Sequence, residues 1–396
     1  MKTLLLFLLL LFTIFPLVSC DMQQPASEGD SDGNSVVGKT VEKTAKKSFL
    51  SIGEFTVEKK SDTLTVVRDG AGRNLALVPR GAADPEDFPV EMIIHTPVKR
   101  VVAYSNFDVA TLRVLGEINT LVGTTTPENR WYVDEVKKGF TDGRIAWVGS
   151  SSGVDYEIVK KQKPDVVLTW DPSIVPMMTE LGIPVVITST PVAMCLNARM
   201  SYVKFLAPFF GREQEADAYF KRVNDSLKVI RERTRGMVHQ PKVMWGDMYE
   251  KRVLVEPGNA WIGELVGLVQ SDYLFEDVYG TACIEISMER FLTSGSDATI
   301  YFTYRSPKTG ATSKEALKRD HPLMAGITPL GPGGNVYSPM AWYSQSGDKL
   351  DEIFTEISAI IHPDAYPDYT LKYFLKLPEK DPVAEEQGSE NREKKI

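Results

Sequence analysis

One short stretch of the sequence has the residue types and spacing of a nucleophilic catalytic motif. The segment Gly149-Ser150-Ser151-Ser152-Gly153 matches the pattern in which a serine, here Ser151, sits on a sharp turn between a strand and a helix. Such a serine needs a histidine and a carboxylate beside it to take its proton. The four histidines of the chain all fall in or beside predicted loops. We therefore interpret the segment as a polar loop, and a serine hydrolase using Ser151 stays open as the alternative from a different functional class.

The remaining short motifs predict neither a metal centre nor a phosphate loop. No histidine stands near a second histidine or a cysteine at the spacing of metal ligands, so we expect no metal bound directly and no cofactor. A metal that is already wrapped in a chelator needs no such ligands. The glycine-rich stretch at 331–335 lacks the Lys-Ser/Thr pair of a phosphate-binding loop and is typical of a turn. Cys195 and Cys283 could pair or stay free, and the sequence leaves both options open.

A cysteine near the N-terminus indicates where the protein works. Cys20 follows an apolar run from Leu4 to Val18 that comes after Lys2, which is the pattern of a secretory signal. A cysteine at the first mature position resembles the lipobox of bacterial lipoproteins. That resemblance implies that the thiol of Cys20 carries lipid and becomes the new N-terminus. We therefore expect a protein of the cell envelope, outside the cytoplasm and anchored to a membrane by lipid.

Composition and length limit the remaining possibilities. A net charge of −8 argues against a nucleic-acid partner, which would require a basic face. The polar residues after Cys20 are typical of a flexible spacer, and the roughly 330 residues between that spacer and the charged C-terminal end exceed one usual core. We expect a signal peptide at 1–19, a tether at 20–48, an N-terminal β extension at 49–98, an N-terminal lobe at 99–210, a linking helix at 211–237, a C-terminal lobe at 238–378 and a disordered tail at 379–396.

The two lobes are predicted to be α/β domains, each a doubly wound parallel sheet. Short apolar runs such as Val101–Tyr104, Leu121–Gly123 and Val166–Trp170 alternate with amphipathic helical segments, which indicates parallel strands covered on both faces. The C-terminal half repeats this scheme more loosely. In the extension, the runs Thr56–Lys59 and Thr63–Val67 predict a β-hairpin laid against the first lobe.

An internal repeat supports two equivalent lobes. Asp155 and Ser287 can each cap a short helix, and each is followed two residues later by a glutamate, Glu157 or Glu289. Eight residues beyond each glutamate, an aspartate leads into an apolar, β-rich run. The same helix-to-strand unit is therefore expected once in each half.

A long amphipathic helix is predicted between the two halves. Apolar residues recur at helical spacing from Glu213 to Arg235, and no glycine or proline interrupts them before Gly236. About 23 residues at ~1.5 Å per residue make a rod of ~35 Å, long enough to run along both lobes. We expect this helix to limit closure of the lobes.

The order of these elements resembles the class of ABC-transporter substrate-binding proteins whose two lobes are joined by one long helix. The motifs that carry the resemblance are the following: Arg100-Val101-Val102, Leu115-Gly116 before Leu121-Val122-Gly123, Val148-Gly149 ahead of Tyr156-Glu157, Lys163-Pro164-Asp165-Val166-Val167, Leu181-Gly182-Ile183-Pro184, and His362-Pro363-Asp364 with Pro367-Asp368. The family binds iron–siderophore complexes, haem and vitamin B12. The resemblance therefore implies a monomeric, non-catalytic protein that delivers a metal chelate to an ABC permease with its ATPase.

The resemblance also implies a docking role for one acidic residue in each lobe, which would pair with arginines of the two permease subunits. Glu157 and Glu289 occupy the matching positions, although both could merely complement helix dipoles. One departure concerns the first helix, where family members usually carry a glutamate and this chain has Ala110.

Aromatic and cationic residues follow the predicted strands, where ligands of doubly wound sheets bind. Aromatic faces with arginines suit a large, flat, partly anionic ligand such as a ferric siderophore, with a corrinoid second and haem third. The predicted ligand-binding residues are Tyr104, Asn106, Arg130, Trp131, Tyr132, Trp170, Trp245, Tyr249, Tyr304, Arg305, Tyr337, Trp342 and Tyr343.

Overall fold

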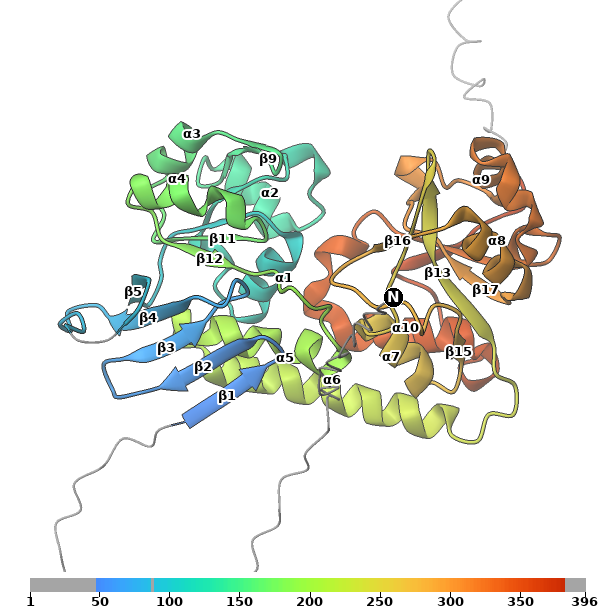
Figure 1. Cartoon of the computed structure of the whole chain (residues 1–396), viewed down its shortest axis with the longest axis horizontal. Coiled ribbons are helices and arrows are strands. Elements are labelled where there is room, and N and C mark those ends of the chain that lie inside the picture. Colours follow the sequence, from blue (N-terminus) through green and yellow to red (C-terminus); the bar gives the residue numbers. More distant parts are fainter. Residues whose placement is uncertain (1–47, 87–88, 382–396) are drawn as a thin grey trace, which may run out of the picture. The chain divides into compact units, whose positions relative to one another are not determined.

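The computed structural model of the chain describes residues 48–86 and 89–381. The signal peptide, Cys20, nearly all of the tether and most of the tail lie outside the described residues. Two α/β lobes follow an N-terminal sheet along the chain (Figure 1). No helix within the described ranges is long and apolar enough to cross a membrane.

The N-terminal lobe is built on a parallel sheet of five strands in the order β12-β11-β6-β7-β8. Val102 and Val167 face the side covered by α3 and α4, whereas Val101 and Val166 face the side covered by α1 and α5. Both faces are therefore buried, which explains the continuous apolar runs. The elements of this lobe are β6 (Val101–Ala103), α1 (Asn106–Val114), β7 (Leu121–Thr124), α2 (Asp134–Thr141), β8 (Ala146–Trp147), β9 (Gly149–Ser150), β10 (Gly153–Val154), α3 (Tyr156–Lys161), β11 (Val166–Thr169), α4 (Val175–Glu180) and β12 (Val185–Ile187).

The N-terminal extension is larger than the predicted hairpin. It forms a five-stranded sheet of β1 (Ser48–Ile52), β2 (Phe55–Lys59), β3 (Thr65–Arg68), β4 (Asn74–Pro79) and β5 (Met92–Thr96), in that order. The predicted hairpin strands correspond to β2 and β3, which pair in antiparallel fashion.

A turn of the extension docks on the edge strand of the N-terminal lobe. The Ile187 amide donates to the Asp69 carboxylate at 3.1 Å, and the Gly70 amide donates to the Ile187 carbonyl at 2.9 Å. Gly70 is required at this point, because a Cβ atom there would lie 1.7 Å from the Ser189 carbonyl oxygen. The extension thereby covers the free edge of β12, which would otherwise expose unpaired backbone groups.

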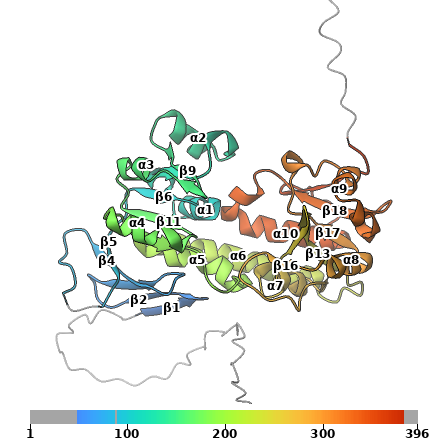
Figure 2. The same ribbon diagram turned by 45° about the horizontal axis from the view of Figure 1, so that its top comes forward.

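Two consecutive helices connect the lobes. The predicted linking helix is α6 (Glu213–Thr234), whose buried residues include Tyr219, Val223 and Leu227 at the expected spacing. It packs against α5 (Leu196–Leu206) and against α10 (Leu350–Ile361) of the C-terminal lobe (Figures 1 and 2). Helix α5 shows no simple amphipathic pattern because most of its residues are buried.

The C-terminal lobe repeats the core of the first and adds antiparallel strands. Its parallel strands lie in the order β18-β17-β13-β15, while β14, β16 and β19 extend the sheet in antiparallel fashion. The elements are β13 (Lys242–Tyr249), β14 (Arg252–Val255), α7 (Trp261–Leu268), β15 (Asp272–Tyr273), β16 (Ile284–Ile286), α8 (Met288–Asp297), β17 (Ile300–Phe302), α9 (Lys314–Asp320), β18 (Asn335–Pro339), α10 (Leu350–Ile361) and β19 (Phe374–Lys376).

The internal repeat predicts the local structure correctly in both lobes. The Asp155 side chain accepts from the Ile158 amide at 3.0 Å, and the Ser287 side chain accepts from the Arg290 amide at 3.1 Å. Each capped helix leads into a strand that pairs in parallel with the first strand of its lobe, β11 with β6 and β17 with β13.

Candidate functional site

A cavity of about 780 Å³ lies between residues of both lobes. Parallel strands of a doubly wound sheet bring the loops at their carboxyl ends to one edge, where ligands bind. The residues that line this cavity, called the cleft below, are Tyr104, Asn106, Thr125, Thr126, Pro127, Asn129, Arg130, Tyr132, Trp147, Ser150, Ser151, Trp170, Ser306, Lys308, Thr309, Ala341, Ser344 and Gln345.

Four strands of the N-terminal lobe end at the cleft. Tyr104 follows β6, Thr125 follows β7, Trp147 ends β8 and Trp170 follows β11. The two tryptophans are 49% and 47% exposed, so large apolar rings face solvent inside a concave surface. The Trp147 indole donates to the Thr125 carbonyl at 3.1 Å, which fixes the orientation of that ring.

The loop after β7 contributes Arg130 and Tyr132 to the cleft. Trp131 between them is 2% exposed, and its indole donates to the Thr126 carbonyl at 3.0 Å. Trp131 has an extended backbone, in which neighbouring side chains point to opposite sides. Burying Trp131 in the core therefore directs Arg130 and Tyr132 outward into the cleft.

The C-terminal lobe supplies the opposite wall of the cleft. Ser306, Lys308 and Thr309 follow β17, and Gln345 belongs to the segment after β18. The Lys308 ammonium group lies 4.8 Å from the centre of the Tyr132 ring, so a cation of one lobe contacts an aromatic ring of the other.

The cleft is cationic and aromatic. Its lining contains Arg130 and Lys308 but no aspartate or glutamate, although the chain as a whole carries a net charge of −8. Neither cation forms an ion pair with a carboxylate in the part of the chain that the structure describes. The Tyr104 hydroxyl is buried without a hydrogen-bond partner among those residues, and burial raises the pKa of Tyr104. These groups can accept an anionic ligand with flat apolar parts.

The predicted site residues divide between the cleft and other surroundings. Tyr104, Asn106, Arg130, Tyr132 and Trp170 line the cleft. The other eight predicted residues do not, and they are Trp131, Trp245, Tyr249, Tyr304, Arg305, Tyr337, Trp342 and Tyr343.

Three of these eight belong to the strands of the C-terminal lobe and stay outside the cleft lining. Trp245 is stacked on Phe302 with ring centres 4.3 Å apart. Tyr337, which is 8% exposed, is also stacked on Phe302, with ring centres 5.6 Å apart. Tyr249 is partly exposed at the turn between β13 and β14, because β13 continues beyond the parallel part of the sheet.

Three further aromatics do not line the cleft, although one of them contacts a lining residue. Trp342 contacts Tyr132 edge to face at 6.0 Å, and its indole donates to the Lys372 carbonyl at 3.1 Å. Tyr343 packs against Phe374 at 5.0 Å between ring centres. Tyr304 is half-buried, and burial together with the nearby Glu256 carboxylate raises the pKa of its hydroxyl.

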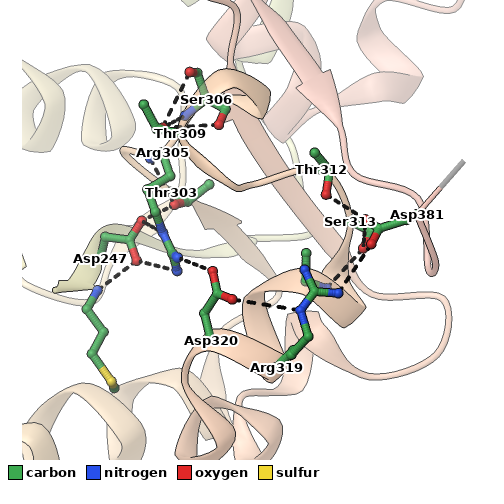
Figure 3. Close-up of polar contacts among 12 residues, drawn as sticks. Asp247, Thr303, Arg305, Ser306, Thr309, Thr312, Ser313, Arg319, Asp320 and Asp381 are labelled. Atoms are coloured by element: carbon green, nitrogen blue, oxygen red, sulfur yellow. Dashed lines mark hydrogen bonds and ion pairs between the residues drawn. The ribbon is translucent and has the colours of Figure 1, made fainter. Parts of the chain in front are cut away.

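Arg305 is paired with two carboxylates and does not belong to the cleft lining (Figure 3). Its guanidinium lies 3.0 Å from the fully buried Asp247 and 3.1 Å from Asp320. The Thr303 hydroxyl also donates to Asp247, so this carboxylate is fully bonded. Arg305 thereby holds the start of the loop that carries Ser306, Lys308 and Thr309 into the cleft.

Sequence reasoning missed three informative residues. Both Trp147 and Lys308 line the cleft. Lys308 follows a predicted strand, so the strand-end rule could have included it, whereas Trp147 lies inside the strand predicted at 145–148. Arg199 lies on α5, which has no clear sequence signal. Its guanidinium is 3.7 Å from the centre of the Phe107 ring and 5.7 Å from that of Trp261, one ring from each lobe. Its Nε atom is buried without a partner in the described ranges, and burial lowers the pKa of Arg199.

Ser151 lines the cleft but does not sit on a strand-to-helix turn. The chain turns back after Ser150 into the antiparallel strand β10, and α3 begins only at Tyr156. None of the hydrogen bonds of the described histidines reaches Ser151. The segment is therefore the polar loop that the sequence indicates.

The remaining candidates have simple surroundings. Glu157 and Glu289 are exposed in the first turns of α3 and α8. Cys195 is buried, Cys283 is exposed, and no disulfide joins them. The described residues contain no cluster of histidine, cysteine and carboxylate side chains that could hold a metal ion.

Two lobes with parallel sheets, a long joining helix and a cleft at the strand ends define a solute-binding protein. Consistent with this architecture, the family model described as periplasmic binding protein matches residues 101–337. The chain therefore belongs to the periplasmic binding protein family.

The chain is also similar in sequence to two curated proteins. An uncharacterized lipoprotein of Methanocaldococcus jannaschii is 26% identical over 297 residues, covering 72% of this chain and 70% of that protein. A second uncharacterized lipoprotein of that organism is 24% identical over 328 residues, with 79% and 82% covered.

Solved structures show the same fold. Helicobacter pylori CeuE in a nickel–histidine complex has a TM-score of 0.56 at 17% identity, covering 77% of this chain and 90% of that one. The periplasmic haem-binding protein RhuT of Roseiflexus in its apo form has a TM-score of 0.53 at 14% identity, covering 67% and 99%.

Proposed function

We propose that this protein is a lipid-anchored, extracytoplasmic receptor that captures a metal chelate and delivers it to an ABC importer. A ferric siderophore is the favoured ligand, and a corrinoid or haem is the alternative bound in the same way. The protein performs no chemistry on its ligand. The ligand would be held between the lobes by ring stacking and by charged hydrogen bonds.

The observation that carries this proposal is the charge of the cleft. On a protein with a net charge of −8, the cleft lining has two cations without carboxylate partners and no acidic residue. Both side chains are exposed and have no carboxylate partner among the described residues, so they are available for charge-assisted hydrogen bonds to an anionic ligand. Tyr132, Trp147 and Trp170 add rings of the kind that pack against flat organic groups.

The similar proteins support a chelate as the ligand class. One solved relative is named as haem-binding, one holds nickel with histidine, and one from Staphylococcus epidermidis is described as possibly iron-binding. Each of these names is a statement about that protein. Two curated relatives are named as lipoproteins, which supports the lipid anchor that we propose at Cys20.

The decisive experiment is a ligand screen monitored by tryptophan fluorescence. Purified protein would be titrated with a ferric tris-catecholate, a ferric hydroxamate, haem and cyanocobalamin. Quenching should occur with at least one chelate and should weaken in Trp147→Phe and Trp170→Phe, while Trp261→Phe outside the cleft lining serves as the control. Native mass spectrometry of protein from its own cells would identify the bound species.

Charge separates the candidate ligands from one another. Arg130→Met should weaken binding of a polyanionic ferric catecholate far more than binding of cyanocobalamin, because the latter offers little negative charge to a guanidinium. Ester hydrolysis that is lost in Ser151→Ala, with no member of the panel bound, would establish the hydrolase alternative instead.

We further propose that Glu157 and Glu289 dock the protein on its permease. Both are exposed in the first turn of a capped helix at equivalent positions of the repeat. Exposed charge pairs add little stability but orient two surfaces and raise their encounter rate.

A further inference from the structure

A short segment of the C-terminal lobe makes contacts with the N-terminal lobe and with the linking helix. This bridging segment, Trp342–Lys349, contains two 3₁₀ turns, Tyr343–Gln345 and Gly347–Lys349, and leads into α10. The Tyr219 hydroxyl of α6 donates to the Gly347 carbonyl at 2.7 Å. The Asp348 carboxylate pairs with Arg113 of α1 at 3.0 Å.

The bridging segment also packs closely on helix α1. A Cβ atom placed on Gly347 would lie 2.8 Å from the Phe107 ring and 3.2 Å from the Cβ atom of Ala110. Ala110 is 1% exposed, so a larger side chain at this position would collide with the bridging segment. The segment is thus seated on two helices outside the cleft, independently of any ligand.

Gln345 of the bridging segment forms hydrogen bonds with the loop of the N-terminal lobe that carries Arg130 and Tyr132. The Tyr132 amide donates to the Gln345 side-chain carbonyl at 2.8 Å, and the Gln345 side-chain amide donates to the Arg130 carbonyl at 2.8 Å. Gln345 is only 4% exposed. The side-chain amide of Gln345 therefore bonds the loop as a peptide group of a neighbouring strand would. It accepts from the residue after Trp131 and donates to the residue before it.

The two bonds act on the residues that face the cleft. Trp131 anchors the middle of the loop to the core of its own lobe, while Gln345 bonds the backbone of its two neighbours. The backbone of Arg130 and Tyr132 sets where the guanidinium and the phenol ring point. Those two side chains belong to one lobe in sequence, but their backbone is fixed by the other lobe.

We propose that Gln345 is a positioning residue that sets the ligand-binding geometry of Arg130 and Tyr132. The inference rests on the proposed capture of a chelate in the cleft. It predicts that the loop keeps its binding geometry only while the bridging segment stays seated on the N-terminal lobe. A movement of one lobe against the other that separates Gln345 from the loop would release the two side chains from their places and weaken ligand binding.

Two substitutions of similar volume test the role. Gln345→Met removes both hydrogen bonds, whereas Gln345→Glu keeps an acceptor for the Tyr132 amide and places a carboxylate oxygen against the Arg130 carbonyl. Gln162→Met, at the end of α3 and outside the cleft lining, is the matched control. Hydrogen exchange in peptides that cover residues 128–134 is measured on the free protein, and binding is measured with the ferric tris-catecholate.

The expected result is graded. In Gln345→Met the Tyr132 amide should exchange at least about tenfold faster, while the amides of β6 and β11 stay protected. In Gln345→Glu that amide should stay protected. Affinity for the ferric tris-catecholate should fall about tenfold in both variants and stay unchanged in the control, and dissociation should account for most of the loss.

Other outcomes would overturn the inference. Faster exchange throughout the lobe would make Gln345 a general stability residue, and unchanged affinity with local loosening would remove its role in binding. If the unsubstituted protein binds no chelate of the panel, the proposed function fails by itself. Exchange at Tyr132 then still decides whether Gln345 orders the loop.

Discussion

The two lobes share one strand order but end their strands differently. The parallel cores β12-β11-β6-β7 and β18-β17-β13-β15 correspond strand by strand, and the capped helices α3 and α8 occupy the same step in both. In the N-terminal lobe, the first strand β6 stops after Ala103 and releases Tyr104 and Asn106 to the cleft. In the C-terminal lobe, its counterpart β13 continues to Tyr249 and pairs with β14.

This difference shows how two lobes with the same core can contribute different residue types to one cleft. Trp245 lies in the part of β13 that pairs with β17 and packs in the core, while the continuation of β13 places Tyr249 at the turn to β14. The C-terminal lobe then serves the cleft through Lys308 and Gln345, which follow β17 and β18. The aromatic side chains of the cleft lining come from the N-terminal lobe, and the C-terminal lobe adds a lysine, hydroxyl groups and one amide.

Each lobe also buries an aspartate, and the two are stabilised in different ways. Asp247 is ion-paired with Arg305, whereas Asp108 accepts hydrogen bonds from the hydroxyls of Tyr202 at 2.8 Å and Thr188 at 3.0 Å. Removing one partner of a buried ion pair leaves an unpaired buried charge and strongly destabilises the protein. A buried carboxyl group that is bonded only by hydroxyls instead makes the free energy of unfolding depend on pH. The predictions below test this contrast.

The largest effect is expected from Arg305→Met. It leaves Asp247 buried without its cation, which should destabilise the protein by about 3–5 kcal/mol. Urea unfolding followed by circular dichroism gives the free energy of unfolding. The double variant Arg305→Met with Asp247→Asn is the control and should recover part of the loss. A cost below ~1 kcal/mol for the single variant would contradict a structural role of Arg305.

Asp108 should make stability depend on pH in the acidic range. Burial raises the pKa of Asp108 from 3.8 to about 6, against the lowering effect of its two hydroxyl partners. As pH rises, the Asp108 carboxyl loses its proton at a lower pH in the unfolded chain than in the folded protein. The free energy of unfolding should therefore fall as pH rises from about 4 to 6, by up to about 3 kcal/mol. Unfolding of Asp108→Asn at pH 4, 5, 6 and 7 should lack this decline. A parallel pH profile in both proteins would refute the prediction.

Arg130→Met should leave stability unchanged but weaken binding of the ferric tris-catecholate about 10- to 100-fold, since charge-assisted hydrogen bonds contribute ~1.5–3 kcal/mol. Arg252→Met is the matched control, because Arg252 is exposed and pairs with Glu285 outside the cleft lining. Fluorescence titration gives the affinities. An equal loss in both variants would indicate a general effect of net charge.

The smallest effect on the isolated protein is expected from charge reversal at both docking positions. Glu157→Arg with Glu289→Arg should change stability by less than about 1 kcal/mol and leave chelate affinity unchanged, because both residues are exposed. Uptake of the chelate by cells should fall sharply. Normal uptake by the double variant, or a loss of chelate affinity, would argue against docking at these residues.

Much of the fold could be predicted because it depends on local patterns. Apolar runs of strand length identify β6, β7 and β11, and an uninterrupted helical period identifies α6. The caps Asp155 and Ser287 mark the same helix start in both lobes. Helix α5 escaped prediction because a helix buried on most sides has no polar face to give it a period.

The cleft was predictable only in part, because the direction of each side chain depends on packing. The strand-end rule places Tyr104, Tyr132 and Trp170 correctly in the cleft lining. It does not distinguish Trp131, which is buried in the core, from its two neighbours, which line the cleft. Composition likewise cannot show whether an arginine is free. Arg130 has no carboxylate partner in the described part of the chain, whereas Asp247 and Asp320, 58 and 15 residues from Arg305, bind that guanidinium.

The sequence by itself determined the class of the protein: local periodicity, helix caps and a repeated unit define two α/β lobes on a long helix. Only the tertiary structure decided which rings and cations face the cleft, and that Gln345 of one lobe bonds the loop of the other. The physical reason is that periodicity depends on neighbouring residues. The exposure and pairing of a side chain depend on residues hundreds of positions away, such as the 213 that separate Tyr132 from Gln345.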